Sequence, residues 1–234
     1  EWLARARKAL DFIWEEMTSQ ENGYIRLNSV YYESVGASIE GFLHDYALLA
    51  DATVRLAGKV ALLDPSLPAL YLERAQICLN SALHRFEDPH ARGYFFTAEG
   101  AEAPVARRKE WFDNATPSGN SVLLHALNAI YALTGETRYA EALSAMFPAY
   151  SDYAQKVASG VAHALEAIAQ NQSGAAVIKF GEGASIEALR EILSARAWRQ
   201  TFIVPDEATA AEGYQLCLGT TCFPPETSAE ALFS

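Results

Sequence analysis

Apolar residues recur every three or four positions through most of the chain, which is the spacing of helices with one buried face. In the first such segment they are Leu3, Ala6, Leu10, Ile13 and Met17. The same pattern predicts further helices over about residues 38–58, 67–86, 117–135, 137–154 and 157–169, with a break near Pro148. Because the connections are mostly short, the pattern favours stacked helical hairpins.

The pattern changes after residue 171. Ala175–Phe180 and Thr201–Val204 are short apolar runs typical of buried strands, Ser185–Ala195 is helical, and Tyr214–Leu218 is a third strand. A strand–helix–strand order favours a parallel pair with a right-handed crossover, and we expect the third strand to join the same sheet. The sequence therefore predicts a helical unit over residues 1–171 and a small α/β subdomain over residues 172–234.

Composition narrows the choice of partners. Half of the residues are apolar, yet no run approaches the roughly 18 consecutive apolar residues of a membrane span. A formal net charge of −11 repels phosphate groups, so we expect neither nucleic acid nor membrane as a partner. The chain starts at Glu1 in a helical pattern without a signal peptide, and we expect it to be the C-terminal part of a longer protein.

Three cysteines are too few for a disulfide scaffold, and a reducing, cytoplasmic setting fits them. Cys217 and Cys222 flank a glycine turn and could oxidise if the turn is tight. We expect reduced thiols without metal, one at the end of a strand and one in the next loop.

Plotting residues 38–58 on a helix places four polar residues on one solvated stripe. They are Glu40, His44, Asp51 and Arg55. Asp45 lies off this stripe among apolar positions, so its carboxylate either has a structural role or faces a polar cavity, because a bare buried charge is very costly.

The densest polar cluster is Lys109-Glu-Trp-Phe-Asp-Asn-Ala-Thr-Pro-Ser-Gly-Asn-Ser121, and it ends at a predicted helix start. Pro117 suits the first helical position, with Thr116 or Ser118 as the cap. Backbone N–H groups gather at such a start beside Ser118 and Asn120, where a hydroxyl-rich or anionic ligand could bind. The alternative is a capped helix start preceded by an Asx turn.

The usual sequence patterns of metal and phosphate sites are missing. The five histidines form no H-x-x-x-H or Cys/His pattern, and they are His44, His84, His90, His125 and His163. Glycine-rich phosphate loops and a G-x-S-x-G elbow are also absent from the sequence. We therefore expect neither a metal nor another cofactor.

The long polar cluster resembles the thioredoxin-domain proteins related to spermatogenesis-associated protein 20. The resemblance extends to His44-Asp-Tyr-Ala47, Gly93-Tyr-Phe-Phe96, Leu133-Thr-Gly-Glu136 with Tyr139, and Cys217-Leu-Gly-Thr-Thr-Cys-Phe-Pro-Pro225. It implies an incomplete (α/α)6 toroid, similar to N-acylglucosamine 2-epimerases and six-hairpin glycosidases, in a mainly α fold closed by the α/β tail. It also implies an N-terminal thioredoxin-like domain outside this chain.

Carried onto this sequence, the resemblance implies a carbohydrate-type pocket on the inner face of the toroid. The implied acid/base residues are Glu110, Asp113 and Asp45, and the implied substrate-binding residues are Tyr46, Trp111, Ser118 and Asn120. The alternative is a scaffold or interaction module that serves the redox domain of the parent protein. An open toroid exposes apolar helix faces, so we also expect self-association of the isolated chain.

Overall fold

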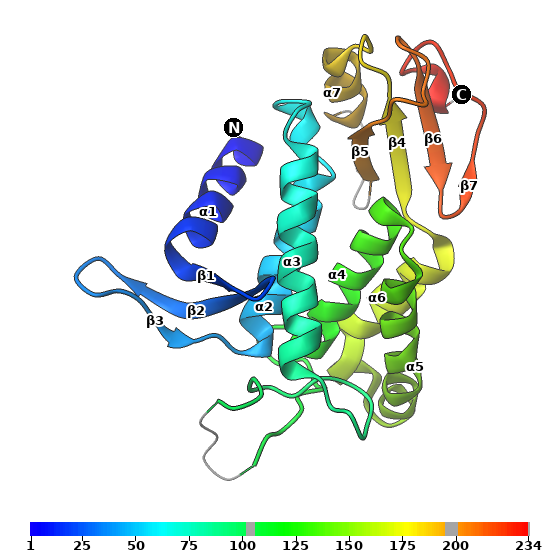
Figure 1. Ribbon diagram of the computed structural model, residues 1–234. Coiled ribbons are helices and arrows are strands. Elements are labelled where there is room, and N and C mark those ends of the chain that lie inside the picture. Colours follow the sequence, from blue (N-terminus) through cyan, green and yellow to red (C-terminus); the bar gives the residue numbers. More distant parts are fainter. Residues whose placement is uncertain (102–105, 195–200, 234) are drawn as a thin grey trace.

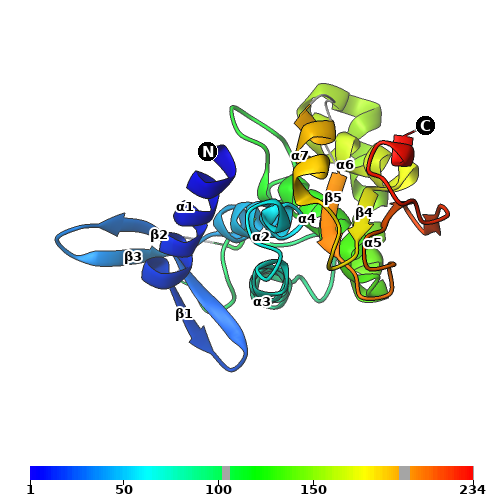
Figure 2. The same ribbon diagram turned by 90° about the horizontal axis from the view of Figure 1, so that it is seen from above.

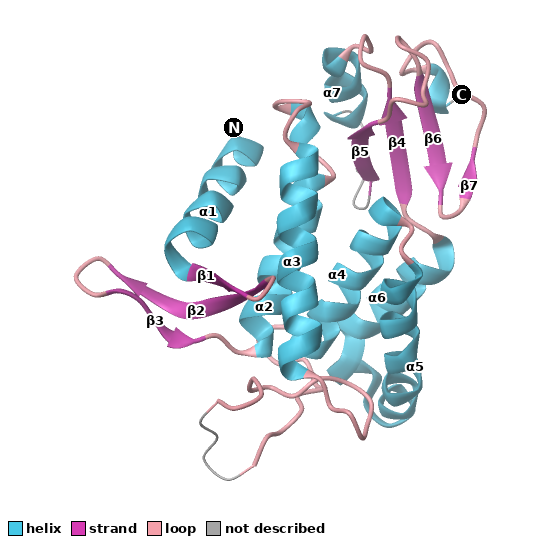
Figure 3. Cartoon of the chain, viewed as in Figure 1, coloured by secondary structure: helices cyan, strands magenta, loops and turns pink. Residues whose placement is uncertain are grey.

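The computed structural model describes residues 1–101, 106–194 and 201–233, and it is mainly α-helical with two small sheets (Figures 1 and 3). The α-helices are α1 (Trp2–Met17), α2 (Leu43–Ala57), α3 (Pro68–Phe86), α4 (Gly119–Thr134), α5 (Thr137–Val157), α6 (Ala162–Ser173) and α7 (Ile186–Ser194). The strands are β1 (Thr18–Glu21), β2 (Tyr24–Tyr32), β3 (Gly36–Glu40), β4 (Ala176–Phe180), β5 (Thr201–Pro205), β6 (Tyr214–Leu218) and β7 (Thr221–Cys222).

Helices α2, α4 and α6 form one row, and α3 and α5 pack behind it. Helix α4 runs between α2 and α6, while α3 packs against α2 and α5 packs against α4 (Figures 1 and 2). Residues 119–127 of α4 are buried without interruption, so α4 is the central element of the main core. Gly119 permits the tight approach of α2, since a Cβ there would lie 3.0 Å from the backbone nitrogen of His44. None of the helices in the described ranges has both the length and the apolar character needed to cross a bilayer.

The predicted start of the helix at residue 117 and the predicted break near Pro148 are wrong. Ser118 caps α4 by accepting a hydrogen bond from the N–H of Ser121, which places Pro117 before the cap and not at the first helical position. Helix α5 continues through Pro148, and the break follows at Ala158–Val161, a 3-10 turn that leads into α6. A proline costs an intrahelical bond, but packing of the flanking residues Met146 and Tyr150 in the core holds α5 together.

The predicted helix over residues 38–58 begins five residues too early. Residues 18–40 form an antiparallel sheet in the order β1-β2-β3, so residues 36–40 pair with the end of β2. The first turn is a two-residue hairpin at Asn22-Gly23 with φ of 54° and 83°, the positive angles that such a turn needs. The sheet projects from the body beside α1 (Figure 2).

The predicted solvated stripe of this helix is also wrong. Glu40 lies in β3, and His44, Asp51 and Arg55 are only partly exposed on α2. The exposed side of α2 instead carries Leu48, which is 45% exposed. Helix α4 packs closely on α2, with Gly119 against His44, so the His44 end of the predicted stripe lies at a helix–helix contact.

The predicted strands of the tail and their pairing are confirmed. Its sheet has the order β5-β4-β6-β7, with β4 and β5 parallel and β6 antiparallel to β4. Ile178 and Ile203 face a small core with Leu189 of α7, whereas Val177 and Phe202 belong to the main core, so helices cover both faces. The last residue predicted for α7, Ala195, lies outside the described residues.

The expectation of reduced thiols in the tail is wrong. Cys217 in β6 and Cys222 in β7 form a disulfide with an S–S distance of 2.04 Å. The physical reason is the two-residue turn at Gly219-Thr220, which places the two cysteines directly opposite each other in the antiparallel ladder. Since these thiols are bonded, they no longer support the argument for a reducing compartment.

Candidate functional site

The carboxylate of Asp113 joins three parts of the chain. Its Oδ1 accepts hydrogen bonds from the N–H of Ser118 at 2.9 Å and the hydroxyl of Ser121 at 2.7 Å. Its Oδ2 accepts one from the N–H of His163 at 3.0 Å, in the first turn of α6. A carboxylate at two helix N-termini is favoured by both helix dipoles. Asp113 therefore holds the starts of α4 and α6 together.

Asn120 clamps the loop that precedes α4. Its side chain is fully buried, accepts a hydrogen bond from the N–H of Tyr94 at 2.9 Å and donates to the carbonyls of Tyr94 and Glu110 at 2.9 and 3.0 Å. The Glu110 carboxylate itself turns outward to Arg108, at 2.8 Å. An amide with all these bonds made within the chain is a structural clamp.

Trp111 packs inward with two tyrosines of α5. Its ring centroid lies 5.2 Å from that of Tyr150 and 5.7 Å from that of Tyr153. The ring also lies against Gly93, where an added Cβ would come within 2.2 Å. The indole is thus engaged by α5 and by the backbone at Gly93.

The two candidates on α2 hold the β-sheet. Asp45 accepts hydrogen bonds from the N–H of Phe42 at 2.9 Å and the hydroxyl of Ser29 at 2.8 Å, so it caps α2 and fixes β2. The buried Tyr46 hydroxyl accepts from the N–H of Leu27 at 2.8 Å, and burial raises the pKa of this phenol. Of the two roles that the sequence left open for Asp45, these contacts match the structural one.

A separate cavity of about 680 Å³ lies at the other end of α4, where the tail meets the helices. The helices contribute Arg55 of α2, His125 and Asn128 of α4, and Ser144 of α5. The end of α6 and the tail contribute Gln170, Asn171, Gln172, Ser173, Phe202, Leu218, Gly219 and Thr220. None of the seven residues predicted from the sequence lines this cavity.

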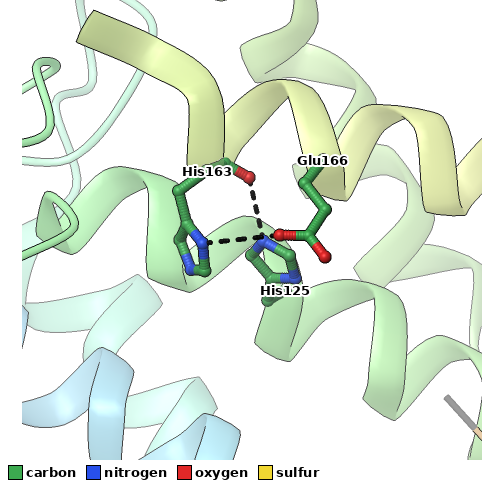
Figure 4. A group of neighbouring side chains, drawn as sticks. All are labelled: His125, His163 and Glu166. Atoms are coloured by element: carbon green, nitrogen blue, oxygen red, sulfur yellow. Dashed lines mark hydrogen bonds and ion pairs between the residues drawn. The ribbon is translucent and has the colours of Figure 1, made fainter. Parts of the chain in front are cut away.

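Two histidines and a glutamate gather beside the cavity (Figure 4). The rings of His125 and His163 lie 4.0 Å apart, and His163 Nδ1 lies 3.9 Å from a carboxylate oxygen of Glu166. One nitrogen or oxygen atom from each of the three side chains lies within 4.8 Å of the others. His125 is 3% exposed, whereas His163 and Glu166 reach solvent.

The electrostatic setting keeps His163 neutral near pH 7. Burial lowers its pKa from the ordinary value near 6.5, and the neighbouring His125 lowers it further. The carboxylates of Asp113, Glu166 and Asp51 act in the opposite direction without prevailing. A neutral imidazole can accept a proton or bind a metal ion.

The polar side of α2 carries two buried polar atoms without partners among the described residues, on Asp51 and His44. Asp51 forms an ion pair with Arg55 at 2.7 Å, and its other carboxylate oxygen is buried with no hydrogen-bond partner within the described residues. His44 Nε2 is likewise buried with no hydrogen-bond partner within the described residues. Unsatisfied buried polar atoms are rare, so such atoms point to a ligand or water nearby.

The sequence patterns we searched could not find this group. His163 and Glu166 are three residues apart on α6, a spacing that places them on one helix face, but H-x-x-E is common in helices. His125 lies 38 residues earlier on another helix and joins them only through packing. The signal in the sequence was therefore present but weak.

No protein-family model matches the chain. It is similar to spermatogenesis-associated protein 20 from Mus musculus, with 30% identity over 164 residues, which is 66% of this chain and 20% of that protein. The protein of the same name from Rattus norvegicus is 28% identical over 179 residues, 73% of this chain and 22% of the relative. The one from Homo sapiens is 29% identical over 156 residues, 63% of this chain and 19% of the relative. The chain thus spans about a fifth of the length of these relatives, and the similarity supports the relation inferred from the motifs.

Proposed function

We propose that this chain forms part of an (α/α) toroid and that the cavity at the C-terminal end of α4 binds a neutral, hydroxyl-rich small molecule of carbohydrate type. The single observation that carries the proposal is the chemistry of the cavity wall. Its polar groups are mainly side-chain amides and hydroxyls, from Asn128, Asn171, Gln172, Ser144 and Thr220 among others.

Amides and hydroxyls suit such a ligand because each sugar hydroxyl both donates and accepts hydrogen bonds. Arg55 is the one permanently charged residue among the described residues of the wall, and Asp51 already neutralises it. A strongly anionic ligand would require more positive charge than this. Tyr131 is a partly exposed aromatic side chain of the same wall, and it offers an apolar ring together with a hydroxyl that can hydrogen-bond.

The arrangement of the helices supports the toroid. Helices α2, α4 and α6 lie side by side, with α3 and α5 packed behind α2 and α4, which is the alternation expected of stacked hairpins. In a toroid the front row would be the inner row, and the polar residues Asp51, Arg55, His163 and Glu166 would then face the centre. The tail would close one end, because the hairpin at Leu218–Thr221 lines the cavity.

The acid/base role expected for Glu110, Asp113 and Asp45 stays a prediction. Asp113 and Asp45 already accept two or more hydrogen bonds within the fold, so Glu110 is the most available of the three. Its carboxylate pairs only with the exposed Arg108 in the described structure, and such a pair is readily exchanged for a ligand. Because Glu110 does not line the cavity, this role is an alternative to the cavity and not a part of it.

Binding of a sugar panel, measured by saturation-transfer NMR, tests the proposal. Ser144 and Ala145 are neighbouring exposed residues of α5, but only Ser144 lines the cavity. We expect Ser144→Trp to fill the cavity and remove binding, and the matched control Ala145→Trp to retain it. Equal binding by both variants, or no binding by the unaltered chain, contradicts the proposal.

A second candidate function is an interaction module. Large apolar side chains are exposed on α1 and on the β2–β3 hairpin, including Trp2 at 78%, Val35 at 74% and Ile39 at 57%. Both elements lie on the same side of the molecule (Figure 2). Exposed apolar groups of this kind favour association with another protein surface, of which self-association is the simplest case.

Sedimentation velocity tests this second candidate. We expect the chain to associate reversibly, and we expect Val35→Asp combined with Ile39→Asp to weaken association at least tenfold. Leu70→Asp alters an exposed apolar residue on α3 and serves as the control. A chain that remains monomeric at all concentrations rules out self-association through this surface.

A further inference from the structure

We propose that His125, His163 and Glu166 form a binding site for a divalent first-row transition-metal ion, with zinc as the first candidate. The inference goes beyond the proposed sugar binding and does not depend on it, because it rests on three ligand side chains at the edge of the cavity. Two imidazoles and one carboxylate are a common ligand set of zinc sites that keep a fourth position open.

The geometry is close to that of a zinc site. With bonds of about 2.0–2.2 Å, two ligand atoms of a tetrahedral zinc ion lie roughly 3.3 Å apart. His163 Nδ1 and the Glu166 oxygen are 3.9 Å apart, and one ring nitrogen of His125 lies within 4.8 Å of a donor atom of each of the other two side chains. His163 and Glu166 are partly exposed, so small rotations of these side chains close the remaining distance.

His125 has one ring nitrogen bonded to the backbone and one without a partner among the described residues. Its Nε2 lies 2.9 Å from the carbonyl oxygen of His163, and because a carbonyl only accepts, Nε2 carries the proton. Nδ1 then has the free lone pair, and it is buried with no hydrogen-bond partner within the described residues. Histidine ligands ordinarily donate their second ring N–H to such a carbonyl or to a carboxylate.

Surrounding bonds hold the Glu166 side chain and the backbone of His163. Gln170 donates to the second carboxylate oxygen of Glu166 at 3.0 Å, and the backbone N–H of His163 donates to Asp113 at 3.0 Å. A hydrogen bond to the free oxygen of a ligating carboxylate, such as that from Gln170, positions the ligand and strengthens metal binding. The exposed side of Glu166 leaves room for water or a ligand hydroxyl at the fourth position of the ion.

The test is titration of the metal-free full chain with Zn²⁺ by calorimetry, without sugar, followed by Co²⁺ absorption spectroscopy to read the coordination. We expect one ion bound per chain and a tetrahedral cobalt spectrum. His163→Asn and Glu166→Gln each alter a partly exposed ligand, so folding should persist, and each should weaken binding by about tenfold or more. His90→Ala removes an exposed histidine elsewhere and should leave the affinity unchanged.

Two results would overturn the metal site. One is the absence of saturable zinc binding by the unaltered chain. The other is zinc binding that is equally tight in His163→Asn and Glu166→Gln, which would place the ion elsewhere. Sugar binding is measured separately with a chelator present, so loss of the metal site and loss of the sugar site give different patterns.

Discussion

Replacing Asp113 with alanine should destabilise the protein strongly, because its carboxylate satisfies backbone groups at two helix starts. The N–H groups of Ser118 and His163 lose their acceptor, while the Ser121 hydroxyl keeps the Ser118 carbonyl at 2.9 Å. Each unsatisfied buried donor costs about 1–3 kcal/mol, so for two donors we expect a loss of about 2–6 kcal/mol. This is a large part of the stability of a typical domain.

Asp113→Asn separates the two contributions. The asparagine oxygen can keep the Oδ1 bonds to Ser118 and Ser121, while its NH2 group then faces the N–H of His163. One donor is left without an acceptor, and the expected loss is about 1–3 kcal/mol. Asn114→Ala alters the next residue, which is exposed, and should change stability by less than about 0.5 kcal/mol.

Urea denaturation followed by circular dichroism measures these differences as shifts of the midpoint at constant slope. The order of stability should be unaltered chain, then Asp113→Asn, then Asp113→Ala. An Asp113→Ala variant within about 0.5 kcal/mol of the unaltered chain would refute the reasoning. It would then leave the carboxylate free for the acid/base role that the sequence suggested.

Three further predictions concern Tyr46, Gly93 and Asp88. Tyr46→Phe removes the acceptor of a buried β2 amide at 2.8 Å and should cost about 1–3 kcal/mol in the same urea assay; an unchanged midpoint would contradict it. Gly93→Ala adds a Cβ at φ 78° and 2.2 Å from the Trp111 ring, so it should shift tryptophan fluorescence and lower stability by more than about 1 kcal/mol, whereas an unshifted spectrum would argue against that packing. The hydrogen bond from Lys109, followed by that from the His90 N–H, holds the pKa of Asp88 below its ordinary value. The stabilising contribution of Asp88 is therefore complete above about pH 4 and is lost as the pH falls through the lowered pKa. In melting curves recorded over a pH series, Asp88→Asn should reduce this loss of stability in acid, and a profile identical to that of the unaltered chain would refute the prediction.

Local sequence patterns predicted those helices and strands whose structure is decided by residues close together in the sequence. The tail strands and α3 match because apolar runs and proline punctuation fix them within a few residues. The sheet at residues 18–40 was missed because its pairs join residues up to about a dozen positions apart, and Ser38 resembles a helix cap when seen alone. The cross-strand partner, which the local pattern does not include, decides the outcome there.

The candidate site also combines features that the local sequence predicts with features that depend on packing between distant segments. The polar cluster at residues 109–121 was correctly located as the start of a helix, but the choice between ligand binding and capping needed the distances at Asp113 and Asn120. The group of His125, His163 and Glu166 is assembled by packing of α4 on α6, and neither helix carries enough of it to be distinctive. The disulfide depended in the same way on the length of one turn.

The most direct test of the central claim is to map where a hydroxyl-rich ligand binds, using the side-chain amide and indole signals of ¹⁵N-labelled protein during a sugar titration. We expect the signals of Asn128, Asn171 and Gln172 to shift together with saturation, because these side chains line the cavity. The signals of Asn120 and Trp111 should stay in place, because both side chains are engaged within the fold. Shifts confined to Asn120 and Trp111 would contradict the account and return the ligand site to the start of α4.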